Sequence, residues 1–159
     1  MKFIRVLFLF AFLAGLSAQA AAQSSSSVVK VRPGASTYTI KQGTAAKLEL
    51  VLDIDSGYHI NSNRPNDRNL VATALKFDRM PGLVVTPVVY PKAKLQKFEF
   101  SEKPLLVFEG SVVLRFTARA LPTANIGALK GKLTIQACND QLCLRPQTVD
   151  VSIPIEIVK

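Results

Sequence analysis

The stretch KGKLTIQACNDQLCLRPQTVDVSIPIEI, residues 130–157, holds two strand patterns joined by a reversal, together with both cysteines of the chain. The two strands are predicted at residues 130–138 and 149–157. Asn139 and Asp140 lie between them and supply turn chemistry, because their side chains bond nearby backbone groups. The stretch therefore predicts two neighbouring strands with Cys138 and Cys143 at the reversal between them.

Alternation along the first of these strands indicates which way Cys138 points. Its apolar face is formed by Leu133, Ile135 and Ala137, and its polar face by Thr134, Gln136 and Cys138. Successive side chains of a strand point to opposite faces of the sheet. We therefore expect Cys138 to point away from the apolar face and to be accessible.

A bridge between Cys138 and Cys143 has two possible roles. As a structural staple, so short a loop contributes roughly 2 kcal/mol in the chain-entropy model. As a redox centre, a bridge in a tight, partly exposed reversal is open to an attacking thiolate. The spacing is CxxxxC and not the CxxC of thioredoxin-like enzymes. Spacing alone leaves both roles open, because a sequence does not give the Cα separation that a disulfide requires.

The N-terminus has the pattern of a signal peptide. Lys2 and Arg5 form a short basic region, residues 6–16 are apolar, and small residues follow at 18–22. This order is typical of a cleaved secretory signal, and the apolar run is too short for a membrane span. We expect residues 1–22 to be removed and residues 23–159 to form one exported domain in a compartment that permits disulfides. Residues 24–27 predict a disordered lead-in.

The rest of the chain consists of short strand patterns separated by turn residues. In the clearest pattern, Leu48, Leu50, Leu52 and Ile54 alternate with mostly polar residues. No segment holds a helical period over three turns. This spacing is typical of an all-β fold, an immunoglobulin-like antiparallel β-sandwich. The expected strands cover residues 28–32, 37–40, 47–54, 72–77, 83–90, 105–108, 111–118, 130–138 and 149–157, with a short one at the start of the polar loop after Gly57 and a long basic-aromatic loop at 91–104.

Charge and motifs disfavour several classes of function. The formal net charge is +9, of which Lys2 and Arg5 contribute two. The remaining basic residues are scattered, apart from a group of lysines at 92–103, and no aromatic ladder accompanies them, so we expect no nucleic-acid partner. There is no nucleophile elbow and no phosphate loop. A copper site formed by Cys138, Cys143, His59 and Met80 would need these side chains to converge, and the lone His59 is better read as structural. We expect no metal and no cofactor.

Three motifs resemble the N-terminal periplasmic domain of the transmembrane disulfide reductase DsbD. They are QACND with CLRP and a closing V-x-I-P-I strand, the loop GYHINSNRP at 57–65, and LVFEG at 106–110. The resemblance covers nearly all of residues 23–159 in order, and the cysteine hairpin is its most specific part. It implies an immunoglobulin-like sandwich that passes electrons by thiol–disulfide exchange.

The resemblance also implies partners and roles. Electrons come from a thioredoxin-like domain or a DsbD-type membrane electron transporter and pass to disulfides of periplasmic proteins. Cys143 forms the mixed disulfide and Cys138 resolves it. A cap loop at residues 97–102 shields the pair through Phe98 or Phe100. We expect no transmembrane segment in the mature chain, so other proteins supply the membrane and thioredoxin-like parts.

Two charged residues flank the pair in the sequence. Asp140 would raise the pKa of a neighbouring thiol by like-charge repulsion, and Arg145 would lower it. No cysteine is expected at a helix N-terminus, so we expect ordinary thiols whose exchange depends on a docked partner. The alternative function is a non-catalytic immunoglobulin-like binding module with a structural disulfide. A structural disulfide should have a lower reduction potential than the disulfide of an electron carrier.

Overall fold

The computed structural model describes residues 24–159, and the expected signal peptide lies outside these residues. Apart from one short 3₁₀ turn, the described secondary structure consists of strands, as the alternating patterns predicted. The elements are η1 (Ser25–Ser27), β1 (Val29–Pro33), β2 (Tyr38–Lys41), β3 (Ala45–Ile54), β4 (His59–Asn61), β5 (Ala74–Phe77), β6 (Leu83–Val85), β7 (Lys94–Gln96), β8 (Leu105–Phe108), β9 (Ser111–Ala120), β10 (Ala128–Ile135), β11 (Ala137–Cys138) and β12 (Gln147–Val158).

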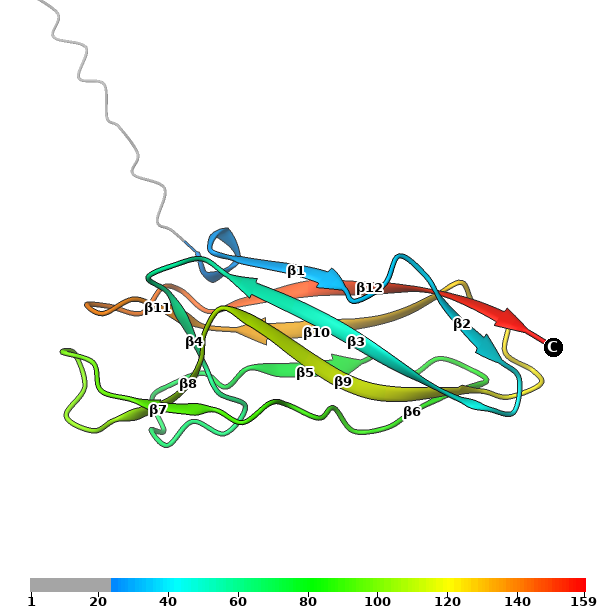
Figure 1. Cartoon of the computed structure of the whole chain (residues 1–159), viewed down its shortest axis with the longest axis horizontal. Helices are drawn as coiled ribbons and strands as arrows, with labels where there is room; N and C mark the ends of the chain where they lie inside the picture. The colour runs from blue at the N-terminus through cyan, green and yellow to red at the C-terminus, as the bar shows by residue number, and fades with distance from the viewer. Residues whose placement is uncertain (1–23) are drawn as a thin grey trace, which may run out of the picture.

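Two four-stranded sheets form the sandwich. Their strand orders are β1-β3-β9-β6 and β2-β12-β10-β5. Pairing is antiparallel except between β2 and β12, which run parallel with Tyr38 opposite Ile155. A third, smaller sheet, β11-β4-β8-β7, lies at one end of the sandwich (Figure 1). The expectation of an immunoglobulin-like β-sandwich is confirmed, with this parallel pair as a local departure from antiparallel pairing.

The core follows from the alternation along β3, β9 and β10. Leu48, Leu50, Leu52 and Ile54 are buried as expected, and they pack in one cluster with inward residues of the facing sheet such as Leu133. Each such aliphatic side chain contributes about 1.5–3 kcal/mol by leaving water. The core therefore fixes the register of the two long sheets.

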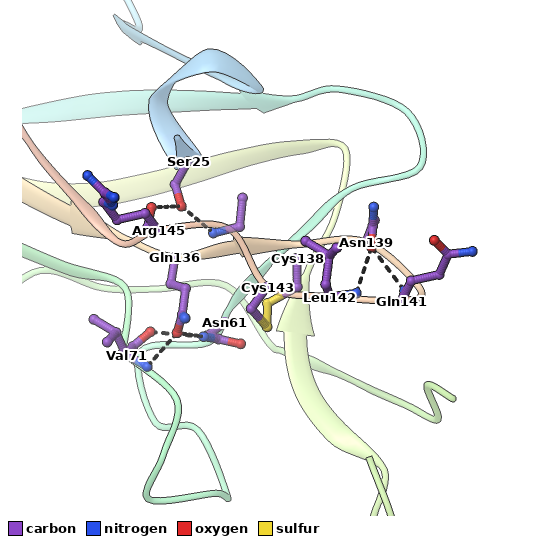
Figure 2. The surroundings of a disulfide bond; sticks show 11 residues. Ser25, Asn61, Val71, Gln136, Cys138, Asn139, Gln141, Leu142, Cys143 and Arg145 are labelled. Carbon is purple, nitrogen blue, oxygen red and sulfur yellow. Dashed lines mark hydrogen bonds between the residues drawn. A yellow bond between two sulfur atoms is a disulfide. The ribbon is translucent and has the colours of Figure 1, made fainter. Parts of the chain in front are cut away.

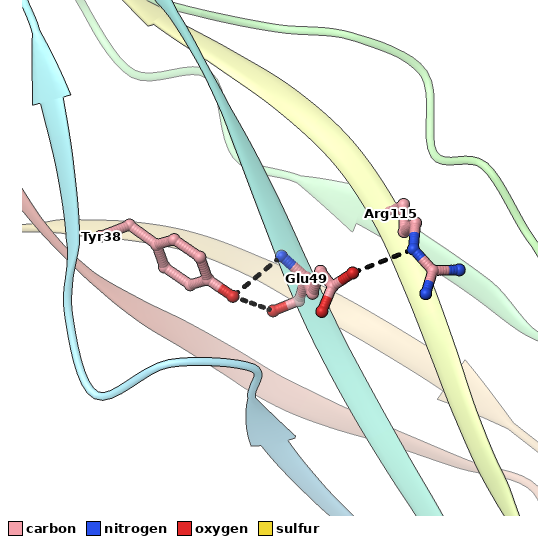
Figure 3. Close-up of polar contacts among 3 residues, drawn as sticks. All are labelled: Tyr38, Glu49 and Arg115. Atoms are coloured by element: carbon pink, nitrogen blue, oxygen red, sulfur yellow. Dashed lines mark hydrogen bonds and ion pairs between the residues drawn. The ribbon is translucent and has the colours of Figure 1, made fainter.

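Tyr38 joins the two sheets at their edge. Its hydroxyl donates to the Glu49 carbonyl oxygen at 3.2 Å and accepts from the Glu49 backbone N–H at 3.1 Å (Figure 3). The Glu49 carboxylate in turn accepts from Arg115 Nε at 2.9 Å. One side chain of β2 thus bonds the backbone of β3, in the opposite sheet, and Glu49 extends the contact to β9.

Several expected element boundaries are corrected. The pattern at residues 83–90 forms only the short strand β6, followed by an isolated bridge between Val89 and Arg115, because Pro87 cannot donate to a ladder. Residues 94–96, expected in a loop, form β7 and pair with β8. Residues 24–27 are not a disordered lead-in. Ser24 is the N-cap residue of η1, which covers Ser25–Ser27, and Ser25 is fully buried.

The last part of the expected strand at 130–138 belongs to a different sheet. β10 ends at Ile135, and β11 begins at Ala137 and pairs with β4. Ala137 and Cys138 are both fully buried, so the expectation that Cys138 is accessible is wrong. The physical reason is the change of sheet after Ile135, because alternation carries no information about burial once the neighbouring strand and its covering layer change.

Within residues 24–159, no helix is long and apolar enough to cross a membrane.

Candidate redox site

Cys138 and Cys143 form a disulfide across a tight hairpin (Figure 2). The S–S distance is 2.04 Å and the two Cα atoms are 3.9 Å apart. Backbone hydrogen bonds flank the pair on both sides, from Asn139 N–H to the Leu142 carbonyl and from Leu144 N–H to the Ala137 carbonyl. The cysteines therefore occupy a non-hydrogen-bonded antiparallel position, where facing Cα atoms come closest together. The backbone ladder thus brings the two sulfur atoms together.

Asn139 shapes the turn of this hairpin, as the sequence predicted. Its Oδ1 atom accepts hydrogen bonds from the backbone N–H groups of Gln141 at 2.9 Å and Leu142 at 2.8 Å. The turn leaves Asp140 and Gln141 exposed, and Leu142 is 50% exposed despite its apolar side chain. An asparagine-capped turn therefore places an apolar residue in solvent directly beside Cys143.

The two cysteines differ in accessibility. Cys138 is fully buried, whereas Cys143 is partly exposed. An external thiolate must reach the sulfur that it attacks, and of the two cysteines Cys143 is the less buried residue. The sequence pattern did not predict this difference, because it assigned Cys138 to the accessible face.

Ser25 holds the base of the hairpin from the N-terminal side. Its hydroxyl donates to the Arg145 carbonyl oxygen at 2.7 Å and accepts from the Ala137 N–H at 2.9 Å (Figure 2). Its own N–H also bonds the Arg145 carbonyl at 3.2 Å. The buried hydroxyl therefore ties together the two arms of the cysteine hairpin. Sequence reasoning missed this contact, because a run of four serines carries no periodic signal.

Gln136 joins the hairpin to the asparagine-rich loop. Its Oε1 atom accepts from Asn61 Nδ2 at 2.9 Å and from the Val71 N–H at 2.8 Å (Figure 2). Asn61 Nδ2 also donates to the Val71 carbonyl at 3.1 Å. These bonds give Asn61 a role in shaping the loop.

The expected cap residues lie beside His59. The His59 ring stacks on Phe98 with centroids 4.0 Å apart, and Phe98 stacks on Phe100 at 5.5 Å. Phe98 is buried in a small cluster with Leu105 and Val107, whereas Phe100 is 37% exposed. Phe98 thus fills a satellite core, and Phe100 is the ring that the loop presents to solvent.

His59 connects these rings to the disulfide. It is the residue that β4 pairs with Cys138 of β11. It is 2% exposed, and burial lowers the pKa of its imidazole below the ordinary value of 6.5, while Glu109 and Asp140 act in the opposite direction. The imidazole is therefore neutral at pH 7.

An open groove of about 510 Å³ lies beside the hairpin. Its lining includes His59 and the carboxylates Asp55, Glu109 and Asp140. Glu109 is bonded to Lys94 at 3.2 Å. Asp140 thus lines this groove. Arg145 is exposed, and its backbone carbonyl oxygen accepts the hydrogen bond from Ser25.

The alternative copper site is not assembled. Cys138 and Cys143 are bonded to each other, and the turn between β5 and β6, which contains Met80, lies at the end of the sandwich opposite β11 (Figure 1). In the described part of the chain, no group of three or more His, Cys, Asp or Glu side chains is placed to hold a metal ion.

The fold and the site together define an immunoglobulin-like β-sandwich domain with a disulfide hairpin at one end. Residues 26–154 match the family model described as thiol:disulfide interchange protein DsbD, N-terminal. The chain therefore belongs to the family of DsbD N-terminal domains, a periplasmic type of thiol–disulfide exchange domain. A search of curated proteins gives no match.

Two solved structures show the same fold at low sequence identity. One is the reduced N-terminal domain of DsbD from Neisseria meningitidis, with TM-score 0.51 and 17% identity over 82% of this chain and 86% of that one. The other is the N-terminal periplasmic domain of ScsB from Proteus mirabilis, with TM-score 0.54 and 13% identity over 79% of this chain. The match spans 45% of the ScsB chain, so this chain corresponds to less than half of that structure.

Proposed function

We propose that this protein is a periplasmic electron carrier that receives electrons from a thioredoxin-like domain or a DsbD-type membrane transporter and reduces disulfides of exported proteins. The observation that carries the proposal is the unequal burial of a disulfide pair in a member of this family. Cys138 is fully buried and Cys143 is partly exposed. Such a pair offers an incoming thiolate one sulfur atom, which a purely structural staple does not require.

The first half of the cycle reduces the Cys138–Cys143 disulfide. A thiolate of the donor attacks Cys143 Sγ, which breaks the S–S bond and releases Cys138 as a thiolate that takes up a proton. The second thiol of the donor then attacks the donor sulfur atom of the mixed disulfide and releases Cys143 as a thiolate, which takes up a proton. The donor leaves as a disulfide, and this protein holds two thiols. Two electrons and two protons have moved from donor to acceptor.

The second half of the cycle runs in the opposite sense on a different partner. The Cys143 thiolate attacks a disulfide of the acceptor protein and forms a mixed disulfide. Cys138 then attacks Cys143 Sγ, restores the intramolecular disulfide and releases the acceptor as a dithiol. In this scheme Cys143 contacts partners and Cys138 resolves the complex, in keeping with the burial of Cys138.

The loop at residues 97–102 is proposed as a cap that limits access to the pair. Its support is the stack of Phe98 and Phe100 on His59, the residue paired with Cys138. Phe98 anchors the loop in its own small core, and Phe100 is the ring that a docking partner would displace. We also propose that residues 1–22 are a cleaved signal peptide and that residues 23–159 act as one domain.

The reduction potential of the pair tests the proposed function. The mature protein is equilibrated in glutathione buffers and its free thiols are trapped and counted. A carrier should have a potential in the range of about −270 to −180 mV spanned by thioredoxin and disulfide isomerase. A value below about −300 mV would instead identify a structural bridge and would favour a binding module.

Trapping variants test the two cysteine roles. In Cys138→Ser, an acceptor disulfide protein should accumulate as a mixed disulfide on Cys143, because the resolving thiol is absent. The matched variant Cys143→Ser should trap far less, because its remaining thiol is buried. Equal trapping by both variants would contradict the assignment.

A further inference from the structure

His59 and Cys138 are direct cross-strand neighbours. The antiparallel pairing of β4 with β11 sets His59 opposite Cys138 and Ile60 opposite Ala137. Side chains at directly paired positions project from the same face of a sheet, with Cβ atoms about 4.5–5.5 Å apart. The one imidazole of the chain thus lies on the same face as the buried sulfur atom of the disulfide.

The imidazole has an unpaired nitrogen. In the described residues, His59 Nε2 and Asn61 Oδ1 are the buried side-chain polar atoms without a hydrogen-bond partner. Most buried polar groups in folded proteins are paired, so an exception has to be explained. His59 is 2% exposed, and in the oxidised protein the sulfur of its strand neighbour carries no proton to share. Reduction of the disulfide to two thiols would put an S–H donor at the position paired with His59.

The environment favours the neutral form of this imidazole, which is the form that can accept a proton. Burial lowers its pKa, and the carboxylates of Glu109 and Asp140, which face it from the β8–β9 turn and the cysteine hairpin, act in the opposite direction. Lys94 is paired with Glu109 and reduces its effect. The rings stacked on His59 are uncharged. In the tautomer protonated at Nδ1, the Nε2 lone pair is free to accept a proton.

We propose that His59 is the proton acceptor for Cys138, so that Nε2 takes the Cys138 thiol proton when Cys138 attacks the mixed disulfide at Cys143. The assignment rests on the proposed function, because it names a residue for the resolving step of that cycle. It explains both the unpaired nitrogen and the placement of a histidine on the strand that pairs with the buried cysteine.

The step balances within the mixed-disulfide complex. Cys138 Sγ loses its proton to His59 Nε2 and forms a bond to Cys143 Sγ. The bond between Cys143 Sγ and the partner sulfur breaks, and the partner leaves as a thiolate. The imidazolium then gives its proton to that thiolate or to water. The pair is oxidised, the partner is reduced, and no further reactant is needed.

The size of the effect follows from thiol ionisation. A thiol with the ordinary pKa of about 8.5 is about 3% thiolate at pH 7, and the thiolate is the nucleophile. An adjacent base that removes the proton during attack can therefore accelerate resolution by up to about 30-fold at this pH. Removal of the base should slow that step about 10- to 30-fold.

The reaction of the reduced protein with Ellman's reagent isolates this step. Cys143 attacks the reagent and releases one coloured thiolate, and Cys138 then releases a second one as the intramolecular disulfide closes. The test variant is His59→Phe, which keeps an aromatic ring against Phe98 but has no basic nitrogen. We expect its second phase to be about 10- to 30-fold slower at pH 7, while its first phase stays within about twofold.

The pH profile separates proton transfer from a structural role. In the wild type, the second phase should slow as the pH falls below 6.5, through the lowered pKa of His59. In His59→Phe the decline should begin at a thiol pKa near 8.5, so the rate already falls between pH 8 and 6.5, where the wild-type rate is constant. Phe98→Leu is the matched control, because it loosens the stack but leaves the imidazole in place and should keep the wild-type onset below pH 6.5. An unchanged profile in His59→Phe would overturn the proposal.

A measurement on the intact histidine needs no change at position 59. His59 is the one histidine of the sequence, so its NMR titration is unambiguous. We expect the curve of the reduced protein to differ from that of reduced Cys138→Ala, because only the first has a thiol at the strand position paired with His59. Coincident curves would overturn the proposal. These assays need no protein partner, so they are independent of the wild-type reduction potential, whose value below about −300 mV would refute the proposed function instead.

Discussion

Replacement of Ser25 by alanine should weaken the cysteine hairpin from a distance of more than a hundred residues in sequence. The Ser25 hydroxyl accepts a hydrogen bond from the Ala137 N–H at 2.9 Å and donates one to the Arg145 carbonyl at 2.7 Å. Ser25 and Ala137 are both fully buried. The change removes one oxygen atom and leaves the packing otherwise intact, so it isolates the contribution of these two bonds.

The two lost bonds do not cost the same. The Arg145 carbonyl keeps a partner, since the Ser25 backbone N–H still donates to it at 3.2 Å. The Ala137 N–H loses its side-chain acceptor in a site without water access, and a buried unsatisfied donor costs about 1–3 kcal/mol. We expect the free energy of unfolding to fall by about 1–3 kcal/mol in Ser25→Ala.

Urea unfolding of the oxidised protein measures this difference. The midpoint should fall while the slope with denaturant stays constant, because the exposed surface of the unfolded state does not change. Ser26→Ala is the matched control in the same turn. Ser26 is exposed and its hydroxyl bonds that of Ser24, so its change should stay within about 0.5 kcal/mol. A Ser25→Ala effect no larger than that of Ser26→Ala would refute the reasoning.

Three further changes test other parts of the site. Phe100→Ala should speed reduction of the disulfide by dithiothreitol, because the exposed ring of the cap is removed. The control Leu95→Ala, at an exposed position of β7, should not change that rate. Equal rates for Phe100→Ala and the wild type would contradict the proposed cap. Gln136→Ala removes the acceptor of the Val71 N–H and should lower the free energy of unfolding by about 1–3 kcal/mol in urea, and an unchanged midpoint would show that this bond is replaced by water. The contribution of His59 to the free energy of unfolding should be complete above pH 6.5 and be lost as the pH drops through its lowered pKa, because the folded state then binds fewer protons than the unfolded one. His59→Phe should flatten this pH dependence between pH 7 and 5. An identical slope in both proteins would exclude His59 as its source.

The sandwich was predictable from the sequence because its strands bury one face and expose the other. In β3, Leu48, Leu50, Leu52 and Ile54 are buried as alternation selected, and Glu49 and Asp53 between them are half-buried, whereas Val51 is buried as well. The same holds for Leu133 and Ile135 in β10. Such positions depend on a local period of two, which a sequence displays directly. The turn role of Asn139 was likewise visible, because it depends on bonds to the next few residues.

The parts of the site that were not predictable depend on contacts distant in sequence. Ser25 bonds residues more than a hundred positions away, and nothing in a serine run indicates such a partner. The burial of Cys138 depends on β11 leaving the sheet of β10 and joining β4, a change that occurs at Gln136 without any break in the strand pattern. The sequence did not distinguish Phe98 from Phe100, whereas the structure places Phe98 in a satellite core and Phe100 at the surface.

The small third sheet places the disulfide hairpin at one end of the sandwich (Figure 1). The two long sheets hold the main core, whereas β11 contributes two residues to a separate sheet with β4, β8 and β7. The pairing of β11 with β4 therefore covers two residues at the end of the domain, whereas Leu48 and Leu133 lie in long ladders. Gln136 and Ser25 hold the hairpin at its base, and Cys143 and the exposed Leu142 lie in the turn beyond them. The anchored base also supports the strand pairing of Cys138 with His59, which is the arrangement on which the proposed resolving step depends.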